Sequence, residues 1–311
     1  MKKCVSIGGQ ALIEGIMMKG PQKTVMAVRG KEKEIIVEEI NETSLTKKHK
    51  ALNLPIIRGV INFIEAMVFG YKALMRSAEL SGFADLEEEN SKMSEKKQST
   101  LMNLLMVVAS VLGVGLALVL FMFLPAFLFN LLNGAVSGAI TPFRALFEGL
   151  LKIIIFLVYI VLVSRTPDIK RVFMYHGAEH KTIFCYEKGL ELTVENIKPQ
   201  GRFHPRCGTS FMVVMLIVGI LITFLVQTLF PFVTKIIWLW VAIKILILPI
   251  ICGVGYEVIK FCGRHDGVVV KILSAPGLWM QRITTIEPTD DMIEIAIAAV
   301  KPVLPEGNEE C

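Results

Sequence analysis

The sequence predicts an α-helical multipass membrane protein with four transmembrane helices, a small N-terminal cytoplasmic β-containing module and an amphipathic helix. Of its 311 residues, 53% are hydrophobic, and the mean hydropathy of +0.59 is too high for a wholly soluble chain. Four apolar runs are long enough to cross a bilayer, which takes about 20 apolar residues. These runs cover residues 102–129, 146–163, 211–230 and 236–256.

The distribution of lysine and arginine predicts how these runs are oriented. Basic residues gather before the first run, between the second and third, and after the fourth, whereas the two remaining connections offer only Arg144 and Lys235. Since basic loops stay on the cytoplasmic side, both termini and the central segment are expected in the cytoplasm. No cleaved signal peptide is expected, because Gly8, Gly9 and Glu14 interrupt the apolar stretch near the amino end.

Net charge bears on the expected binding partners, and cysteine content bears on disulfide formation. The net charge of +5 is small and lies on the loops, which predicts attraction to anionic membrane lipid and no nucleic-acid partner. Disulfides are not expected, because the cysteines lack paired spacing and most of them fall on the reducing side. They are Cys4, Cys185, Cys207, Cys252, Cys262 and Cys311.

The same patterns divide the chain into six segments. Residues 1–50 are predicted to form the β-rich module, with strand-like runs at 24–29 and 34–40 joined by a turn. Residues 51–100 hold the amphipathic helix, which starts after Pro55 and runs to Leu80, and a polar linker. We expect this helix either to lie in the membrane interface or to pack against the bundle. The remaining segments are the first transmembrane hairpin (101–163), a cytoplasmic loop with a candidate metal site (164–210), the second hairpin (211–256) and a cytoplasmic C-terminal segment with a terminal helix (257–311).

Two histidines in the central segment are the leading functional candidates. Thr166 followed by Pro167 is a typical helix start, so residues 168 to about 182 are predicted to be helical. His176 and His180 are then one turn apart and share a face, which is how a helix offers two nitrogen ligands to one metal ion.

Glu179 lies between these histidines in the sequence. The five residues 176–180 fit the inverted zinc-hydrolase pattern His-x-x-Glu-His, in which the glutamate is the general base toward a metal-activated water. Alternatively, the carboxylate of Glu179 could orient a bound water or accept a hydrogen bond from a ring N–H of a ligating histidine.

Further donors follow in the same segment, at His204 and Cys207. Imidazole and thiolate together suit zinc, whose character is borderline soft. If His176, His180, His204 and Cys207 all bind, the tetrahedron is closed and the site is structural; if three bind, a water position stays open for hydrolysis. The histidines could instead bond backbone carbonyls with no metal, and Cys207 could be a small buried hydrophobe.

Other residues could complete this site or replace its chemistry. A cysteine nucleophile is one option, with Cys207 attacking and His204 as base, although the two intervening residues argue against their contact on a regular element. Lys181 or Arg206 could stabilise an oxyanion. Candidates from other cytoplasmic segments are Glu14, Glu257, Arg264, His265 and Asp266.

The chain resembles the YqhQ-like family of uncharacterised bacterial multipass membrane proteins, which are labelled predicted metal-dependent enzymes. The stretches that carry the resemblance are residues 8–21, 176–181, 204–210 and 276–279 together with Gln281. The resemblance implies an inner-membrane location and a metal, without implying a reaction.

These observations lead to one functional prediction and two alternatives. The leading prediction is a zinc-dependent hydrolase at the cytoplasmic face, acting on peptide or lipid-linked bonds near the interface. The first alternative is a non-catalytic assembly or chaperone-like factor with a membrane-protein or peptide partner, in which any metal ties the central loop to the bundle. The second is a transporter that uses the intramembrane charges Lys152, Lys244 or Glu148.

Overall fold

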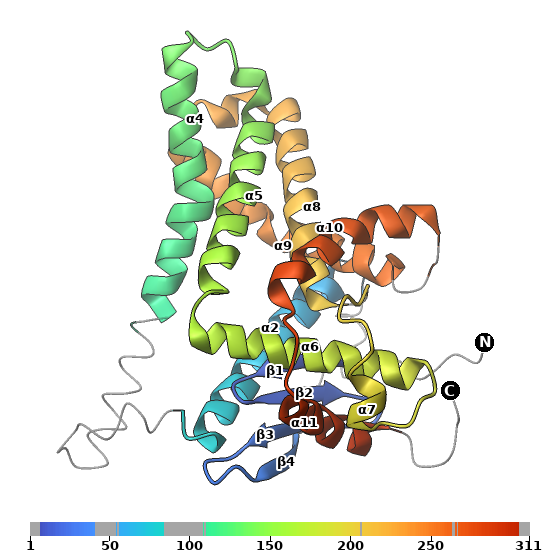
Figure 1. Ribbon diagram of the computed structural model, residues 1–311. Coiled ribbons are helices and arrows are strands. Elements are labelled where there is room, and N and C mark those ends of the chain that lie inside the picture. Colours follow the sequence, from blue (N-terminus) through green and yellow to red (C-terminus); the bar gives the residue numbers. More distant parts are fainter. Residues whose placement is uncertain are drawn as a thin grey trace, which may run out of the picture.

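The computed structural model describes residues 7–40, 54, 56–83, 108, 110–205, 207–262, 265 and 267–304, with the backbone alone at 209–211 and 259. An upright bundle of apolar helices stands on a body made of a small β-sheet and its covering helices (Figure 1). The sheet body draws on both ends of the sequence and on the segment between the two helical hairpins. The candidate site lies in this body.

The sheet has four antiparallel strands in the order β1-β2-β3-β4. The predicted hairpin is confirmed as β3 (Thr24–Arg29) and β4 (Ile35–Ile40), paired from Thr24↔Ile40 to Arg29↔Ile35. β1 (Gly8–Leu12) and β2 (Gly15–Lys19) were not predicted. Their glycines have low strand propensity, and the turn between them places Glu14 at a positive φ of 50°.

Helices cover both faces of the sheet, because its apolar residues alternate along the strands. One face packs under α6 (Pro167–Glu187) and α11 (Asp290–Val300), where Ile16 and Met18 meet Tyr175 and Ile293. On the other face Met17 and Met26 form a cluster with Ala73 of α2 (Ile57–Leu80). The N-terminal module is therefore part of a larger core that later segments complete.

Four helices are long and apolar enough to cross a membrane, which confirms the predicted number of apolar helices. They cover Ser110–Ala135, Thr141–Val163, Met212–Leu229 and Ile237–Cys262. The first extends beyond its predicted end at residue 129: a π-turn at η3 (Val119–Phe123) leads directly into α4 (Leu124–Ala135), so Pro125 lies near the start of a helical segment and does not end the span. The predicted residues 102–107 lie outside the described part of the chain.

The other helices of the bundle connect as antiparallel neighbours. α5 (Arg144–Val163) follows the short η4 (Thr141–Phe143), and α8 (Gly208–Leu229) leads through η5 (Pro231–Thr234) to α9 (Ile237–Cys262). α2 packs against α9, where Gly59 and Gly253 bring the two backbones together. Arg58 donates two hydrogen bonds to Glu257 across the same contact, at 2.7 and 2.5 Å. The amphipathic helix thus packs against the bundle, which is one of the two arrangements expected for it.

The C-terminal segment contains a helix that was not predicted. α10 (Val268–Thr284) contains Pro276 and Gly277 in its interior, and these residues obscured its periodicity. α10 packs mainly against α8. The terminal helix predicted within 287–304 is confirmed as α11, which ends at Val300 and continues as the short η6 (Lys301–Val303). A single-turn helix, α7 (Val194–Ile197), follows α6.

Candidate metal centre

Helix α6 positions the two histidines. It begins at Pro167 after Thr166, whose extended backbone makes it the N-cap residue, and it ends at Glu187, five residues beyond the predicted 182. The extended segment after α10 crosses α6 closely, since the Ile286 amide donates to the Phe173 carbonyl at 2.9 Å. Gly177 permits this approach, because a Cβ atom there would overlap the carbonyl oxygen of Ile286.

Each histidine is oriented by a backbone carbonyl. Nδ1 of His176 lies 2.8 Å from the carbonyl oxygen of Thr284, and Nδ1 of His180 lies 2.5 Å from that of Arg202. Because a carbonyl oxygen only accepts, Nδ1 is the protonated nitrogen in both rings and donates to it. Both Nε2 atoms are therefore left with a lone pair, which is the tautomer that metal-binding histidines adopt.

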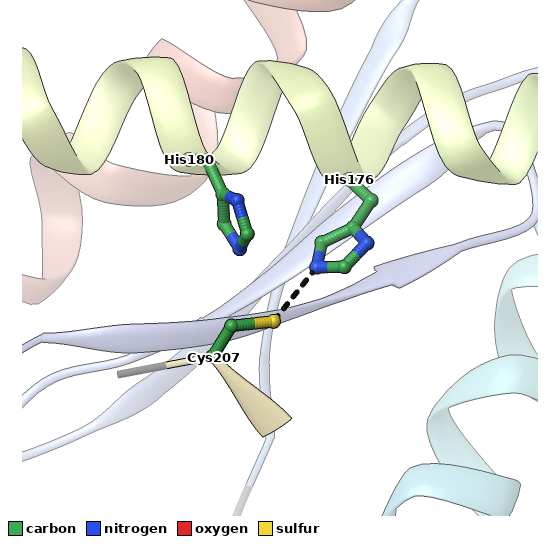
Figure 2. A group of neighbouring side chains, drawn as sticks. All are labelled: His176, His180 and Cys207. Atoms are coloured by element: carbon green, nitrogen blue, oxygen red, sulfur yellow. Dashed lines mark hydrogen bonds between the residues drawn. The ribbon is translucent and has the colours of Figure 1, made fainter. Parts of the chain in front are cut away.

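Cys207 completes a group of three donors. Its Sγ lies 3.1 Å from Nε2 of His176, and the ligand atoms of His176, His180 and Cys207 all lie within 4.8 Å of one another. Figure 2 shows the two imidazoles descending from α6 toward the cysteine, which immediately precedes α8. The rings of His176 and His180 pack edge to face with centroids 4.4 Å apart.

His204 does not join this group. Its Nε2 lies 3.3 Å from Oε2 of Glu187, and its ring packs edge to face on Phe184 with centroids 4.8 Å apart. Both contacts lie toward the C-terminal end of α6. The arrangement thus brings together three of the four ligands proposed from the sequence.

Gln281 holds the segment that carries the third donor. Its Oε1 accepts from the His204 amide at 2.7 Å, and its Nε2 donates to the His204 carbonyl at 2.8 Å. Gln281 is fully buried. The sequence singled this residue out only as part of a family-like stretch, and no local pattern identified its role.

Glu179 is buried beside the donors and only partly satisfied. It is 5% exposed, it accepts a hydrogen bond from the Gly9 backbone, and burial raises the pKa of its carboxyl to about 7, while nearby His176 and the Gly9 bond oppose the rise. Among the described residues, its Oε2 finds no hydrogen-bond partner. Burial likewise lowers the pKa of His180, and a hydrogen bond to Cys207 opposes this. Neutral imidazole is the form that binds metal.

Ion pairs fasten the surrounding segments to each other. Lys181 is buried, donates to the Lys198 carbonyl at 2.6 Å and pairs with Glu287. Arg202 pairs with the same carboxylate at 3.1 Å. Lys181 thus ties α6 to the segment before α11, so its ammonium is not directed at the histidines as the oxyanion role requires.

The remaining sequence candidates lie elsewhere. Glu14 pairs with Arg171, Glu257 with Arg58, and Nδ1 of His265 lies 3.0 Å from the Phe261 carbonyl. Three further candidates, Arg206, Arg264 and Asp266, lie outside the described residues, as do Cys4 and Cys311.

Comparison with known proteins supports the expected family. Residues 54–306 match the family described as "Protein of unknown function (DUF1385)". The chain is 38% identical over 299 residues to the "Uncharacterized protein YqhQ" of Bacillus subtilis (strain 168), covering 96% of this chain and 92% of the relative. The chain belongs to this family. No solved structure matches it.

The family assignment covers the whole candidate metal centre. His176, His180, Cys207, Glu179 and Gln281 all fall within the matched residues, whereas the glycine-rich β1 lies before them. Similarity to the bacterial relative extends over nearly the full length of both chains. The resemblance seen in the sequence is therefore confirmed at the level of the family, and the metal-dependent activity stays a prediction.

Proposed function

We propose that this protein is a zinc-dependent membrane hydrolase that acts at the cytoplasmic face of the bacterial inner membrane. The observation that carries the proposal is the shared orientation of His176 and His180. Each donates a hydrogen bond from Nδ1 to a backbone carbonyl and directs Nε2 toward Cys207. Two histidines whose Nδ1 atoms are hydrogen-bonded in this way, together with a nearby thiol, form a donor set that suits zinc.

Two further features bear on the fit to a metal ion, the first against it and the second for it. Ligand atoms around a tetrahedral zinc lie about 3.5 Å apart, given its bond lengths, and the three donors here are separated by up to 4.8 Å. Binding of zinc therefore requires side-chain rotations that bring the three donor atoms closer together. The second feature is Oε2 of Glu179, which has no hydrogen-bond donor among the described residues. A buried carboxylate oxygen normally has a partner, and a bound ion or its water could be that partner.

Three protein ligands favour catalysis over a closed structural site. With His204 turned to Glu187, a tetrahedral ion would keep one position for water or substrate. When bound there, zinc supplies a Lewis acid and makes water a stronger nucleophile near neutral pH. Glu179 is the residue we assign as general base, since its carboxylate is buried beside the donors and keeps one oxygen available to accept a proton.

The location of the site supports a substrate near the interface. The sheet body and α6 lie together at one end of the helical bundle (Figure 1), and Cys207 directly precedes the apolar helix α8. Basic residues predict that this end faces the cytoplasm. Peptide or lipid-linked bonds presented at the membrane surface are the substrates that could reach it.

The decisive experiment compares two Glu→Gln substitutions on one helix. Full-length protein is loaded with zinc in liposomes and assayed against fluorogenic peptide, ester and lipid phosphodiester substrates, and bound zinc is quantified in parallel. Glu179→Gln is expected to keep its zinc and lose turnover by at least about 100-fold, the lower range for a general base. The matched control Glu187→Gln, which alters the contact with His204, is expected to keep most of the activity.

The rival proposal is a non-catalytic assembly or chaperone-like factor, in which a structural metal ties the central segment to the bundle. Hydrogen bonds from the histidines to Thr284 and Arg202 support a tying role of this kind. Under this proposal Glu179→Gln is nearly silent, whereas Cys207→Ala loosens the segment before α8 and raises its protease sensitivity. The transporter alternative has less support, because Lys244 is engaged in a buried ion pair with Glu148.

A further inference from the structure

A buried charged cluster links α5 and α9 inside the apolar bundle. Glu148 of α5 accepts from Nε of Arg144 at 2.9 Å, from the Trp240 indole at 2.9 and 3.0 Å, and from Lys244. Arg144 also donates to the Thr234 carbonyl at 2.5 Å. All four side chains of this cluster are buried. Both oxygens of the only acidic residue in it are thus already occupied.

The charges of this region do not balance. Lys152 follows Glu148 by one helical turn and lies at the middle of the Thr141–Val163 span. Glu148 is paired with Arg144 and Lys244, and within the described chain no carboxylate lies within ion-pair distance of Lys152. One carboxylate therefore faces three cationic side chains, Arg144, Lys152 and Lys244. Excess positive charge in an apolar span is costly unless an anion accompanies it.

A cavity lies beside the unpaired lysine. It has a volume of about 320 Å³ and is bounded by α2, η3, α5, α8 and α9, with Phe63, Met122, Met215 and Ile251 among its apolar lining residues. Glu148 and Lys152 are the charged side chains on its wall. Because Glu148 is already saturated by its donors, Lys152 is the group available to a ligand there.

We infer that this cavity binds a single-chain amphiphile with a carboxylate head, of the fatty-acid class, and that Lys152 pairs with the head. The volume is at the lower end of the range of about 300–1,000 Å³ for ligand pockets, which favours one chain over the two chains of a phospholipid. The apolar lining accepts the chain, and one ammonium matches one carboxylate. The inference needs the proposed membrane insertion and is independent of the metal site.

The test uses photocrosslinking of the full-length protein in zwitterionic nanodiscs. The probe is hexadecanoic acid carrying a diazirine on its chain, and the competitors are unlabelled hexadecanoate, hexadecanol and the two-chain anionic lipid phosphatidylglycerol. We expect labelling to map to α5 and α8 beside the cavity. We also expect hexadecanoate to compete about tenfold better than the other two, as one charge-assisted contact implies.

Variants of Lys152 decide whether the ammonium is responsible. Lys152→Met is expected to lose the tenfold preference for the acid over the alcohol, and Lys152→Arg to retain it. The matched control is Lys170→Met, which removes an exposed lysine from α6 and should change nothing. Bound zinc, measured in the same samples, should be unaltered in all variants, so a failure of the metal proposal would be seen separately.

Three results would overturn the inference. The first is equal competition by the acid and the alcohol in the wild-type protein. The second is better competition by phosphatidylglycerol, which would assign the site to an ordinary phospholipid. The third is an unchanged preference in Lys152→Met protein that elutes as wild type on size exclusion.

Discussion

The side-chain amide of Gln281 bonds both backbone groups of His204, through contacts of 2.7 and 2.8 Å. Gln281 lies in α10 and His204 lies between α6 and α8, so the two residues join segments that the second apolar hairpin separates in sequence. Cys207 follows three residues after His204. The segment that carries the thiol is therefore held by a residue outside the group of three donors.

Gln281→Leu is expected to weaken zinc binding about 10- to 100-fold, the usual cost of losing a hydrogen bond that holds metal ligands in position. The leucine fills similar space but leaves the buried amide and carbonyl of His204 unpaired. Competition with a chromogenic zinc chelator measures the affinity. Gln200→Leu is the matched control, because that glutamine bonds Lys188 and Asn196. Equal affinities in the two variants would rule out the positioning role.

Removing single donors is expected to separate the three ligands from His204. His180→Ala and Cys207→Ser should each reduce bound zinc from one ion per chain to a small fraction, because both contribute to the donor group. His204→Ala should keep the stoichiometry of one. Elemental analysis of purified protein gives the ratio. If His204→Ala loses its zinc as completely as the others, the site is a closed four-ligand structural one.

Gly177→Ala is expected to destabilise the protein by about 1–3 kcal/mol, the usual cost of overpacking. Alanine normally favours a helix over glycine by about 1 kcal/mol, but here its Cβ overlaps a backbone carbonyl that cannot rotate away. Thermal unfolding of the zinc-free protein in detergent measures the change. In Gly201→Ala the nearest atom is 3.8 Å from the new Cβ, so no loss is expected, and similar melting of both variants would contradict the argument.

Helix α10 is expected to lie against the membrane surface. Trp279 is 71% exposed, and Val268, Val269 and Ile272 are exposed on the same helix, which is typical of an interfacial amphipathic helix. The fluorescence lost in Trp279→Phe gives the contribution of this tryptophan. Lipids brominated near their head groups should quench that contribution, and acrylamide should not. The reverse result would place α10 in water.

Much of the architecture could be predicted because local residue patterns determine it. The apolar runs identified the four long helices, and Thr166 with Pro167 identified the start of α6. The β1 strand was missed because Gly8 and Gly9 disfavour strands, and it forms because β2 and α6 complete its packing. Helix α10 was missed because Pro276 and Gly277 lie inside it, held by its packing on α8.

The candidate site, too, could be predicted only in part. Helical spacing was sufficient to place His176 and His180 on one face, and Cys207 lies close to them, although its role as a ligand stays a prediction. The direction of His204 depended on Glu187, which lies beyond the predicted end of the helix. The hydrogen bonds to the carbonyls of Thr284 and Arg202 could not be predicted, because every residue has a backbone carbonyl and the sequence does not show which one is used. Thr284 also lies 108 positions from His176 in the sequence.

The carbonyl that orients His176 belongs to a residue synthesised after both apolar hairpins. A ribosome that has reached Cys207 has produced all three donors, but it has not yet produced Thr284 or Gln281. The growing polypeptide therefore carries His176 and the thiol before it contains the residues that orient His176 and hold the His204 backbone, whereas the carbonyl that orients His180 is already present. The candidate centre can therefore be completed only after α10, which carries Gln281 and Thr284, has been synthesised.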